Sequence, residues 1–243
     1  MMQSRHNRFI NNVLPESQDK KYNPIIDYDE SPAQSLEGTV KNLIPLVPGV
    51  LGYVSSANAN CKRDSNLLTQ DESAAIYLYT MSTPFVSSLN MALRSDNRRV
   101  REPWFAFLKL LNTALIKLPS TKTTVWRGIN NDATLQFIDN DVYTWWGITS
   151  CSVDINSVRP FLGQSGTLFT IETIHGKDIS EFSAIFDERE VILLSGTRVR
   201  ARSSSLNLMD QFFIIHLEEV TSPRLVYDLV NVNLSTKCLN YKS

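Results

Sequence analysis

The sequence predicts an α+β fold in which a helical N-terminal part packs on a β-rich core, with a cleft where the two meet. Two observations lead to this prediction. Between about residues 69 and 118, apolar residues recur at helical spacings of three and four. After Pro119 the chain changes to short runs of β-branched and aromatic residues separated by Gly, Asn, Asp and Ser. These runs are mostly too closely spaced for helices between them, which favours an antiparallel or mixed sheet.

Three helices are expected in the helical part. The first follows the capping-box sequence Thr-Gln-Asp-Glu at 69–72, in which the threonine and glutamate cap each other's backbone N–H groups. Thr83 and Pro84 offer an N-cap and a first helical residue for the second. The third begins near Pro103 and ends at Pro119, and its apolar residues form one broad face.

The domain organisation predicted from these patterns is simple. Residues 1–40 form a polar N-terminal arm, and residues 41–243 form a single domain with its helical part at about 69–118 and its β-rich part at about 120–230. Residues 156–162 are expected to form a short helix or a loop. The expected strands lie in the runs TTVWRG, VYTWWGITS, TLFTIETI, EVILL, TRVRAR, FFIIHLEEV and RLVYDLV.

The composition argues against several kinds of partner. With 24 Lys and Arg against 25 Asp and Glu, the chain has no overall attraction to nucleic acid or to an anionic membrane, although Arg198, Arg200 and Arg202 are a candidate local basic patch. Three scattered cysteines and three histidines predict neither a disulfide framework nor a metal site. Without a signal peptide or an apolar run of about 18 residues, a cytoplasmic protein is expected, with secretion by a non-classical route left open.

Two of the expected strands end in residues suited to chemistry. Arg127 and Gly128 close the first, where the glycine lets another group approach the backbone. In the next expected strand, Ser150 and Ser152 point to one face and Cys151 points to the opposite face. Taken singly, these residues favour a solvated or ion-paired arginine and serines that form an ordinary turn. Cys151 is a candidate nucleophile with no recognisable activating partner.

Glu188 and Glu190 form the third candidate feature. If residues 188–194 are one extended strand, both carboxylates point to the same side, about 7 Å apart, and Arg189 points to the other. Such a pair suits acid–base chemistry or the stabilisation of positive charge at a sugar carbon. The alternative is a solvated strand end.

In combination, these residues resemble the R-S-E class of ADP-ribosyltransferases, which includes clostridial-toxin-like and arginine-specific mono-ADP-ribosyltransferases. The resemblance covers roughly residues 69–220 and implies a two-sheet core with an NAD cleft. Where the family typically has threonine between the two serines, this chain has Cys151. That residue lies on the face opposite the serines, so the site is expected to tolerate it. The residues that carry the resemblance are Arg127, Ser150, Ser152, Glu188 and Glu190.

The resemblance implies that NAD is a substrate, cleaved at its nicotinamide–ribose bond, and that no metal takes part. Arg127 would hold the diphosphate through its planar guanidinium, and Gly128 would leave room for the nicotinamide amide. Ser150 would position the nicotinamide ribose, with Ser152 also on the NAD side. Glu190 matches the catalytic glutamate, which binds the ribose 2′-hydroxyl and stabilises the oxocarbenium-like transition state.

The resemblance also implies the acceptor. A glutamate at the position of Glu188 goes with arginine acceptors in this family, since a carboxylate binds a guanidinium through two hydrogen bonds. The preceding loop, 180–188, matches the family's acceptor-recognition loop. In it, Phe182 is assigned to NAD and Phe186 to the acceptor, with one of the two expected to be a core anchor instead. The partners are then NAD and an arginine-containing protein.

Other hypotheses stay open at this point. Water could replace arginine as the acceptor, which would make the chain an NAD glycohydrolase, or the fold could bind NAD without turnover. A glycosidase would use Glu188 and Glu190 but would leave Arg127 and Ser150 without a role. A transferase that modifies nucleic acid is disfavoured by the neutral net charge.

Overall fold

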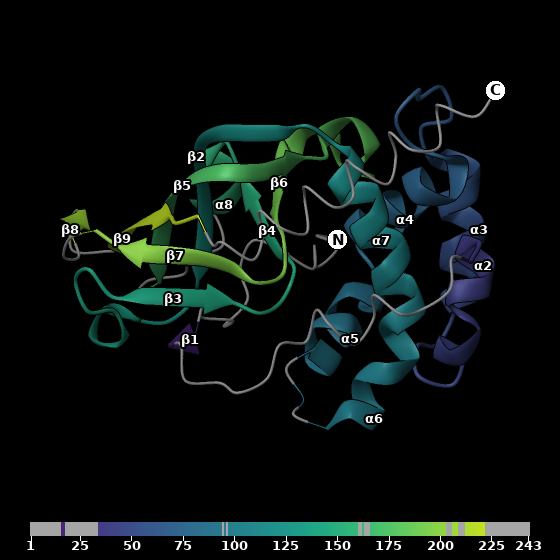
Figure 1. Ribbon diagram of the computed structural model, residues 1–243, viewed down its shortest axis with the longest axis horizontal. Helices are drawn as coiled ribbons and strands as arrows, with labels where there is room; N and C mark the ends of the chain where they lie inside the picture. Colours follow the sequence, from purple (N-terminus) through teal and green to yellow (C-terminus); the bar gives the residue numbers. More distant parts are fainter. Residues whose placement is uncertain are drawn as a thin grey trace, which may run out of the picture.

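The computed structural model describes residues 16–17, 34–93, 95, 97–159, 162, 166–202, 206–208 and 212–221. It shows a helical layer beside a β-rich half (Figure 1), which confirms the predicted α+β class. In the helical layer the elements are α2 (Leu36–Thr39), η1 (Lys41–Leu43), α3 (Val50–Asn60), α4 (Gln70–Thr80), α5 (Pro84–Leu93), α6 (Arg98–Arg101), η2 (Glu102–Trp104) and α7 (Phe105–Lys117).

The β-rich half follows directly. Its elements are β2 (Ser120–Ile129), η3 (Thr134–Gln136), β3 (Val142–Trp145), β4 (Thr149–Ser152), α8 (Ile155–Val158), β5 (Thr167–Asp178), η5 (Ser180–Phe182), η6 (Phe186–Glu188), β6 (Glu190–Leu193), β7 (Thr197–Ala201), β8 (Leu206–Leu208) and β9 (Phe212–Glu219), with β1 (Glu16–Ser17) added from the N-terminal region.

Helix α4 begins as its sequence predicts. The Thr69 side chain accepts a hydrogen bond from the Glu72 N–H, and the Glu72 carboxylate accepts one from the Thr69 N–H. The Glu72 carboxylate also forms an ion pair of 2.6 Å with Lys117 at the end of α7. Helix α4 is thus fixed at its N-terminus and packed between α3 and α7.

The helical layer begins earlier than the predicted range of 69–118. Leu36 of α2 is fully buried in the helical core, within the segment that was predicted to be a polar arm. Helix α3 also precedes the predicted range. A helix as short as α2 contains barely one turn, so it shows no helical periodicity in the sequence.

The strands form one hydrogen-bonded sheet with the order β1-β3-β7-β9-β5-β2-β4-β6, and β8 pairs with β9. Strand β5 is central: it pairs antiparallel with β2 along its length, parallel with β9 at its start and antiparallel with β6 at its end. Side chains from β2 to β7 and from β9 meet in one apolar cluster. The strands of this sheet therefore share one apolar core.

Each expected strand from TTVWRG to FFIIHLEEV is present, and RLVYDLV lies outside the described residues. The run VYTWWGITS is divided into β3 and β4 because the chain changes partners there. Strand β3 pairs with β7, whereas β4 pairs with β2 and β6. The short helix expected within 156–162 is α8, which begins one residue earlier.

Candidate active site

The centre of the candidate site is the antiparallel pair of strands β4 and β6. Ser152 is opposite Glu190, and Ser150 is opposite Ile192. The ladder thereby brings the predicted Ser-x-Ser sequence beside the predicted catalytic glutamate. The Glu190 side chain is fully buried, and Ser150 is only 2% exposed.

Arg127 joins them from the neighbouring strand β2. Arg127 is 1% exposed, and its Nη1 donates a 2.8 Å hydrogen bond to the backbone carbonyl of Ser150. Trp126, the preceding residue, is in register with Ser152 of β4. The three residue types of the predicted constellation, arginine, serine and glutamate, therefore come from three adjacent strands of one sheet.

The Ser150 hydroxyl has a partner that sequence reasoning missed. Tyr79, near the end of α4, lies with its Oη 2.9 Å from the Ser150 Oγ, and both residues are buried. The contact crosses from the helical layer to the sheet. No motif around Tyr79 could have indicated it, because in the sequence this tyrosine is one of several apolar residues on a helix.

The Ser152 hydroxyl forms hydrogen bonds with the backbone at Glu188 and Asp154. Its Oγ donates a 2.7 Å hydrogen bond to the Glu188 carbonyl and accepts one of 2.9 Å from the Asp154 N–H. The residue is fully buried. These two bonds tie the Ser152 hydroxyl to the backbone at Glu188 and at Asp154, and its role on the NAD side stays a prediction.

The prediction that residues 188–194 form one extended strand is wrong. Glu188 ends the 3₁₀ turn η6, Arg189 has left-handed backbone angles of φ 46° and ψ 54°, and β6 begins only at Glu190. The bond from Ser152 to the Glu188 carbonyl, and one of 3.3 Å from the Val153 N–H to the Arg189 carbonyl, hold this turn. The strand argument for placing both carboxylates on one side therefore does not apply.

The two phenylalanines of the loop have opposite surroundings. Phe182 is 6% exposed and belongs to the helical core, with the Lys62 ammonium 5.4 Å from its ring centroid. Phe186 is 64% exposed. One of the two was expected to be a core anchor, and it is Phe182. Its ring supports the loop from the helical core, and its assignment to NAD stays a prediction.

Cys151 is unsuited to be a nucleophile. Its side chain lies in the apolar cluster inside the sheet, on the other side of β4 from the two serines. Burial raises the pKa of the thiol to about 12, partly offset by the positive charge of Arg127, while the Glu190 charge raises it further. The thiol is therefore neutral at physiological pH, whereas the reactive form of cysteine is the thiolate.

Comparison with known proteins accounts for this arrangement. A model of the family described as NAD:arginine ADP-ribosyltransferase matches residues 56–220, which include the whole candidate site. The chain belongs to this family. A protein of Mycobacterium avium (strain 104), inferred to be an NAD(+)–arginine ADP-ribosyltransferase and named Mav, is 30% identical over 154 residues. The match covers 63% of this chain and 18% of the length of that relative.

Solved structures of ADP-ribosyltransferases share the fold. The Vis toxin of Vibrio splendidus superposes with a TM-score of 0.55 at 19% identity, over 81% of this chain and 91% of that one. The eukaryotic mono-ADP-ribosyltransferase ART2.2 gives a TM-score of 0.59 at 19% identity, over 77% and 84% of the two chains. At such low identity these likenesses support the architecture and leave the acceptor open.

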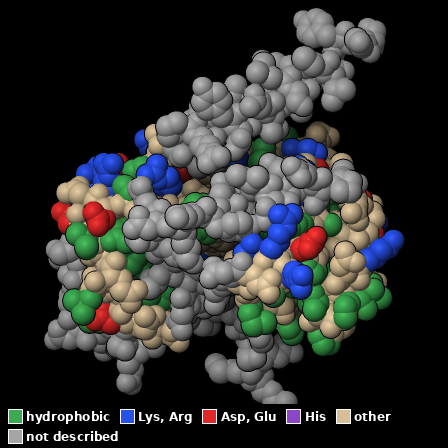
Figure 2. Space-filling view, turned by 60° about the horizontal axis from the view of Figure 1, so that its bottom comes forward, with side chains coloured by type: hydrophobic (Ala, Val, Ile, Leu, Met, Phe, Trp, Pro, Cys, Tyr) green, Lys and Arg blue, Asp and Glu red, His purple; other side chains and the backbone are tan. Residues whose placement is uncertain are grey.

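Two of the three arginines in the candidate basic patch, Arg200 and Arg202, lie near the carboxylate of Glu218. Arg200 is in register with Glu218 of β9, and Arg202 Nε lies 2.5 Å from the Glu218 carboxylate. On the face drawn in Figure 2, Lys and Arg side chains lie in separate small groups, some beside acidic side chains. The Glu218 carboxylate therefore offsets part of the positive charge of these arginines.

In the part of the chain that the structure describes, no helix is both long and apolar enough to cross a membrane. The same residues contain no group of three or more His, Cys, Asp or Glu that could hold a metal ion.

Proposed function

We propose that this protein is a mono-ADP-ribosyltransferase that cleaves the nicotinamide–ribose bond of NAD and transfers ADP-ribose to arginine side chains of a protein acceptor. The observation that carries the proposal is the contrast between its two glutamates. Glu190 is fully buried beside Ser152 on a strand, and Glu188 is half-buried on the turn immediately before it.

Glu190, Ser150 and Arg127 suit the NAD side of the reaction. As nicotinamide leaves, positive charge develops on the ribose, and a carboxylate in a buried site stabilises that charge far more than one in water. A guanidinium has five N–H donors in a planar fork, which suits a diphosphate as well as the Ser150 carbonyl that Arg127 already binds.

Glu188 suits the acceptor side. A carboxylate binds a guanidinium bidentately and lowers the cost of bringing this cation next to an electron-poor sugar carbon. Two comparisons support an arginine acceptor. The family is described as NAD:arginine ADP-ribosyltransferase, and the Vis toxin was solved in complex with agmatine, a small guanidinium compound. The exposed Phe186, two residues earlier on the same turn, offers an apolar contact for a protein substrate.

Labelled NAD, with agmatine or polyarginine as acceptor, tests the proposal. Glu190→Gln removes the charge that stabilises the transition state, so transfer and NAD hydrolysis both fall on the order of a hundredfold or more. Glu188→Ala loses transfer to agmatine but keeps measurable hydrolysis. Asp187→Asn is the matched control, because Asp187 is an exposed carboxylate on the same turn, and both of its activities stay at the wild-type level.

Each alternative has its own result. Full transfer by Glu190→Gln contradicts the mechanism. Hydrolysis by the wild type without transfer to any guanidinium acceptor identifies an NAD glycohydrolase. NAD binding with neither activity identifies a silent NAD-binding module.

A further inference from the structure

The end of helix α4 contacts the candidate site at two consecutive residues. Tyr79 Oη lies 2.9 Å from Ser150 Oγ on strand β4. Thr80 Oγ1 accepts a 2.7 Å hydrogen bond from the Ala184 N–H in the loop that leads to Glu188. These contacts join residues 71 and 104 positions apart in the sequence, so they exist only because the helical layer packs against the sheet.

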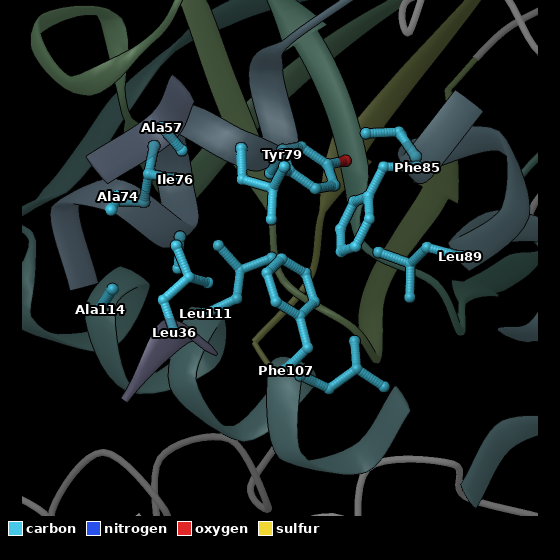
Figure 3. Packing of buried hydrophobic residues seen from close by; sticks show 14 of the residues in the cluster. Leu36, Ala57, Ala74, Ile76, Tyr79, Phe85, Leu89, Phe107, Leu111 and Ala114 are labelled. Carbon is cyan, nitrogen blue, oxygen red and sulfur yellow. The ribbon is translucent and has the colours of Figure 1, made fainter. Parts of the chain in front are cut away.

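Tyr79 is firmly held and reaches the site only with its hydroxyl. Figure 3 shows its ring among the apolar side chains of the helical core and its oxygen at the edge of the group. A phenol is a better proton donor than an aliphatic alcohol, so the favoured arrangement has Tyr79 donating to Ser150. The Ser150 hydroxyl then keeps its own proton for a sugar oxygen, while its carbonyl is fixed by Arg127.

Thr80 holds the other part of the site. Its hydroxyl donates to the helix carbonyl of Tyr77 at 2.9 Å and accepts from Ala184, and the residue is fully buried. From Ala184 the loop continues into η6, where the Glu188 N–H donates to the Ile185 carbonyl at 3.2 Å. The position of Glu188 therefore depends on the short loop segment from Ala184 to Glu188, which is hydrogen-bonded to Thr80 at its start.

We infer that Tyr79 and Thr80 are positioning residues with separate effects: Tyr79 sets the NAD-cleavage step through Ser150, and Thr80 sets acceptor use through the loop that carries Glu188. The inference deepens and rests on the proposed function. Helix α4 is a suitable support for both, because its N-terminus is fixed by the capping box and by the ion pair between Glu72 and Lys117.

The test measures NAD hydrolysis and transfer to agmatine separately, below the unfolding midpoint of each variant. In Tyr79→Phe, which lacks only the hydroxyl, kcat for both activities falls about tenfold while KM for agmatine stays unchanged. In Thr80→Val, KM for agmatine rises about fivefold to tenfold while kcat for hydrolysis stays near the wild-type value. Thr80→Ser keeps the hydroxyl and restores the KM.

Two matched controls remove the same groups away from the site. Tyr143→Phe deletes a buried phenol hydroxyl that accepts a 2.7 Å hydrogen bond from the Ile138 N–H on the far part of the sheet. Thr113→Val deletes a helical hydroxyl that donates to the Lys109 carbonyl at 2.7 Å, without any bond to a loop. Both variants keep wild-type kcat and KM for both activities.

The results separate this inference from the proposed function. If the wild type transfers ADP-ribose to agmatine but Tyr79→Phe and Thr80→Val behave like their controls, the positioning inference is wrong and the proposed function stands. Equal losses of hydrolysis and transfer in Thr80→Val also overturn the assignment of Thr80. If the wild type only hydrolyses NAD, the proposed arginine transfer fails, and the hydrolysis rate of Tyr79→Phe still decides the role of Tyr79.

Discussion

The strand pair β4–β6 and the loop from 180 to 189 hold the two glutamates in different ways. Every residue of β4 and β6 is buried, and ladder hydrogen bonds fix Glu190 opposite Ser152. The loop consists of two 3₁₀ turns with a left-handed residue, Arg189, at its end, and much of its surface is exposed. It is attached by a few side-chain bonds and by the ring of Phe182.

The difference separates two requirements of the proposed reaction. Stabilising charge on the ribose needs a carboxylate whose place is set to within a fraction of an ångström, which a buried strand provides. Recognising an acceptor needs an accessible group on a segment that tolerates change, which a surface turn provides. Changes to the loop should therefore affect acceptor use first, and changes to the strand pair should affect both activities.

The largest effect is expected from removing the anchor of the loop. Phe182→Ala deletes a buried ring and lowers the free energy of unfolding by about 3 kcal/mol. Phe186→Ala, the matched exposed position, changes it by less than about 0.5 kcal/mol. Urea unfolding measures both. Similar losses from the two substitutions would show that the loop is not anchored through Phe182.

An intermediate effect on acceptor use is expected from removing the Ser152 hydroxyl, through which strand β4 holds the turn at Glu188. Ser152→Ala leaves the Glu188 carbonyl and the Asp154 N–H without this partner, so the ratio of agmatine transfer to NAD hydrolysis falls about fivefold. Ser73→Ala is the control, since its hydroxyl donates to the Lys62 carbonyl at 2.6 Å in the helical layer. A ratio that stays the same in Ser152→Ala would mean that the turn keeps Glu188 in place unaided.

The smallest effect is expected at Cys151, inside the sheet. Cys151→Ala keeps both activities, and the wild-type thiol reacts slowly with alkylating reagents at neutral pH because it stays protonated. In the unfolded chain a thiol ionises near 9.0, whereas in the folded protein its pKa is about 12. The folded state then binds more protons between these values, so wild-type stability falls as pH rises through this range.

The comparison of unfolding free energies isolates the thiol. The other titrating groups are the same in the wild type and in Cys151→Ala. Any advantage of the wild type in free energy of unfolding therefore narrows or reverses above pH 9. A difference that does not depend on pH would contradict the raised pKa. Loss of activity in Cys151→Ala would restore Cys151 as a candidate for chemistry.

The sequence by itself determined the α+β class and the helix starts at Thr69 and Thr83. It also singled out Arg127, Ser150 and Glu190, which the structure places on three adjacent strands. These features depend on local patterns: capping residues, the period of apolar side chains, and the order of short motifs along the chain.

Only the tertiary structure decided how the two glutamates differ, that Phe182 is in the core while Phe186 is exposed, and that Tyr79 and Thr80 reach the site. The turn at Glu188 depends on the Ser152 hydroxyl from another strand, and both α4 contacts depend on how the helical layer meets the sheet. Such interactions join residues that are far apart in the sequence. A local pattern in one chain carries no signal for them, since the partner is chosen by packing rather than by neighbouring residues.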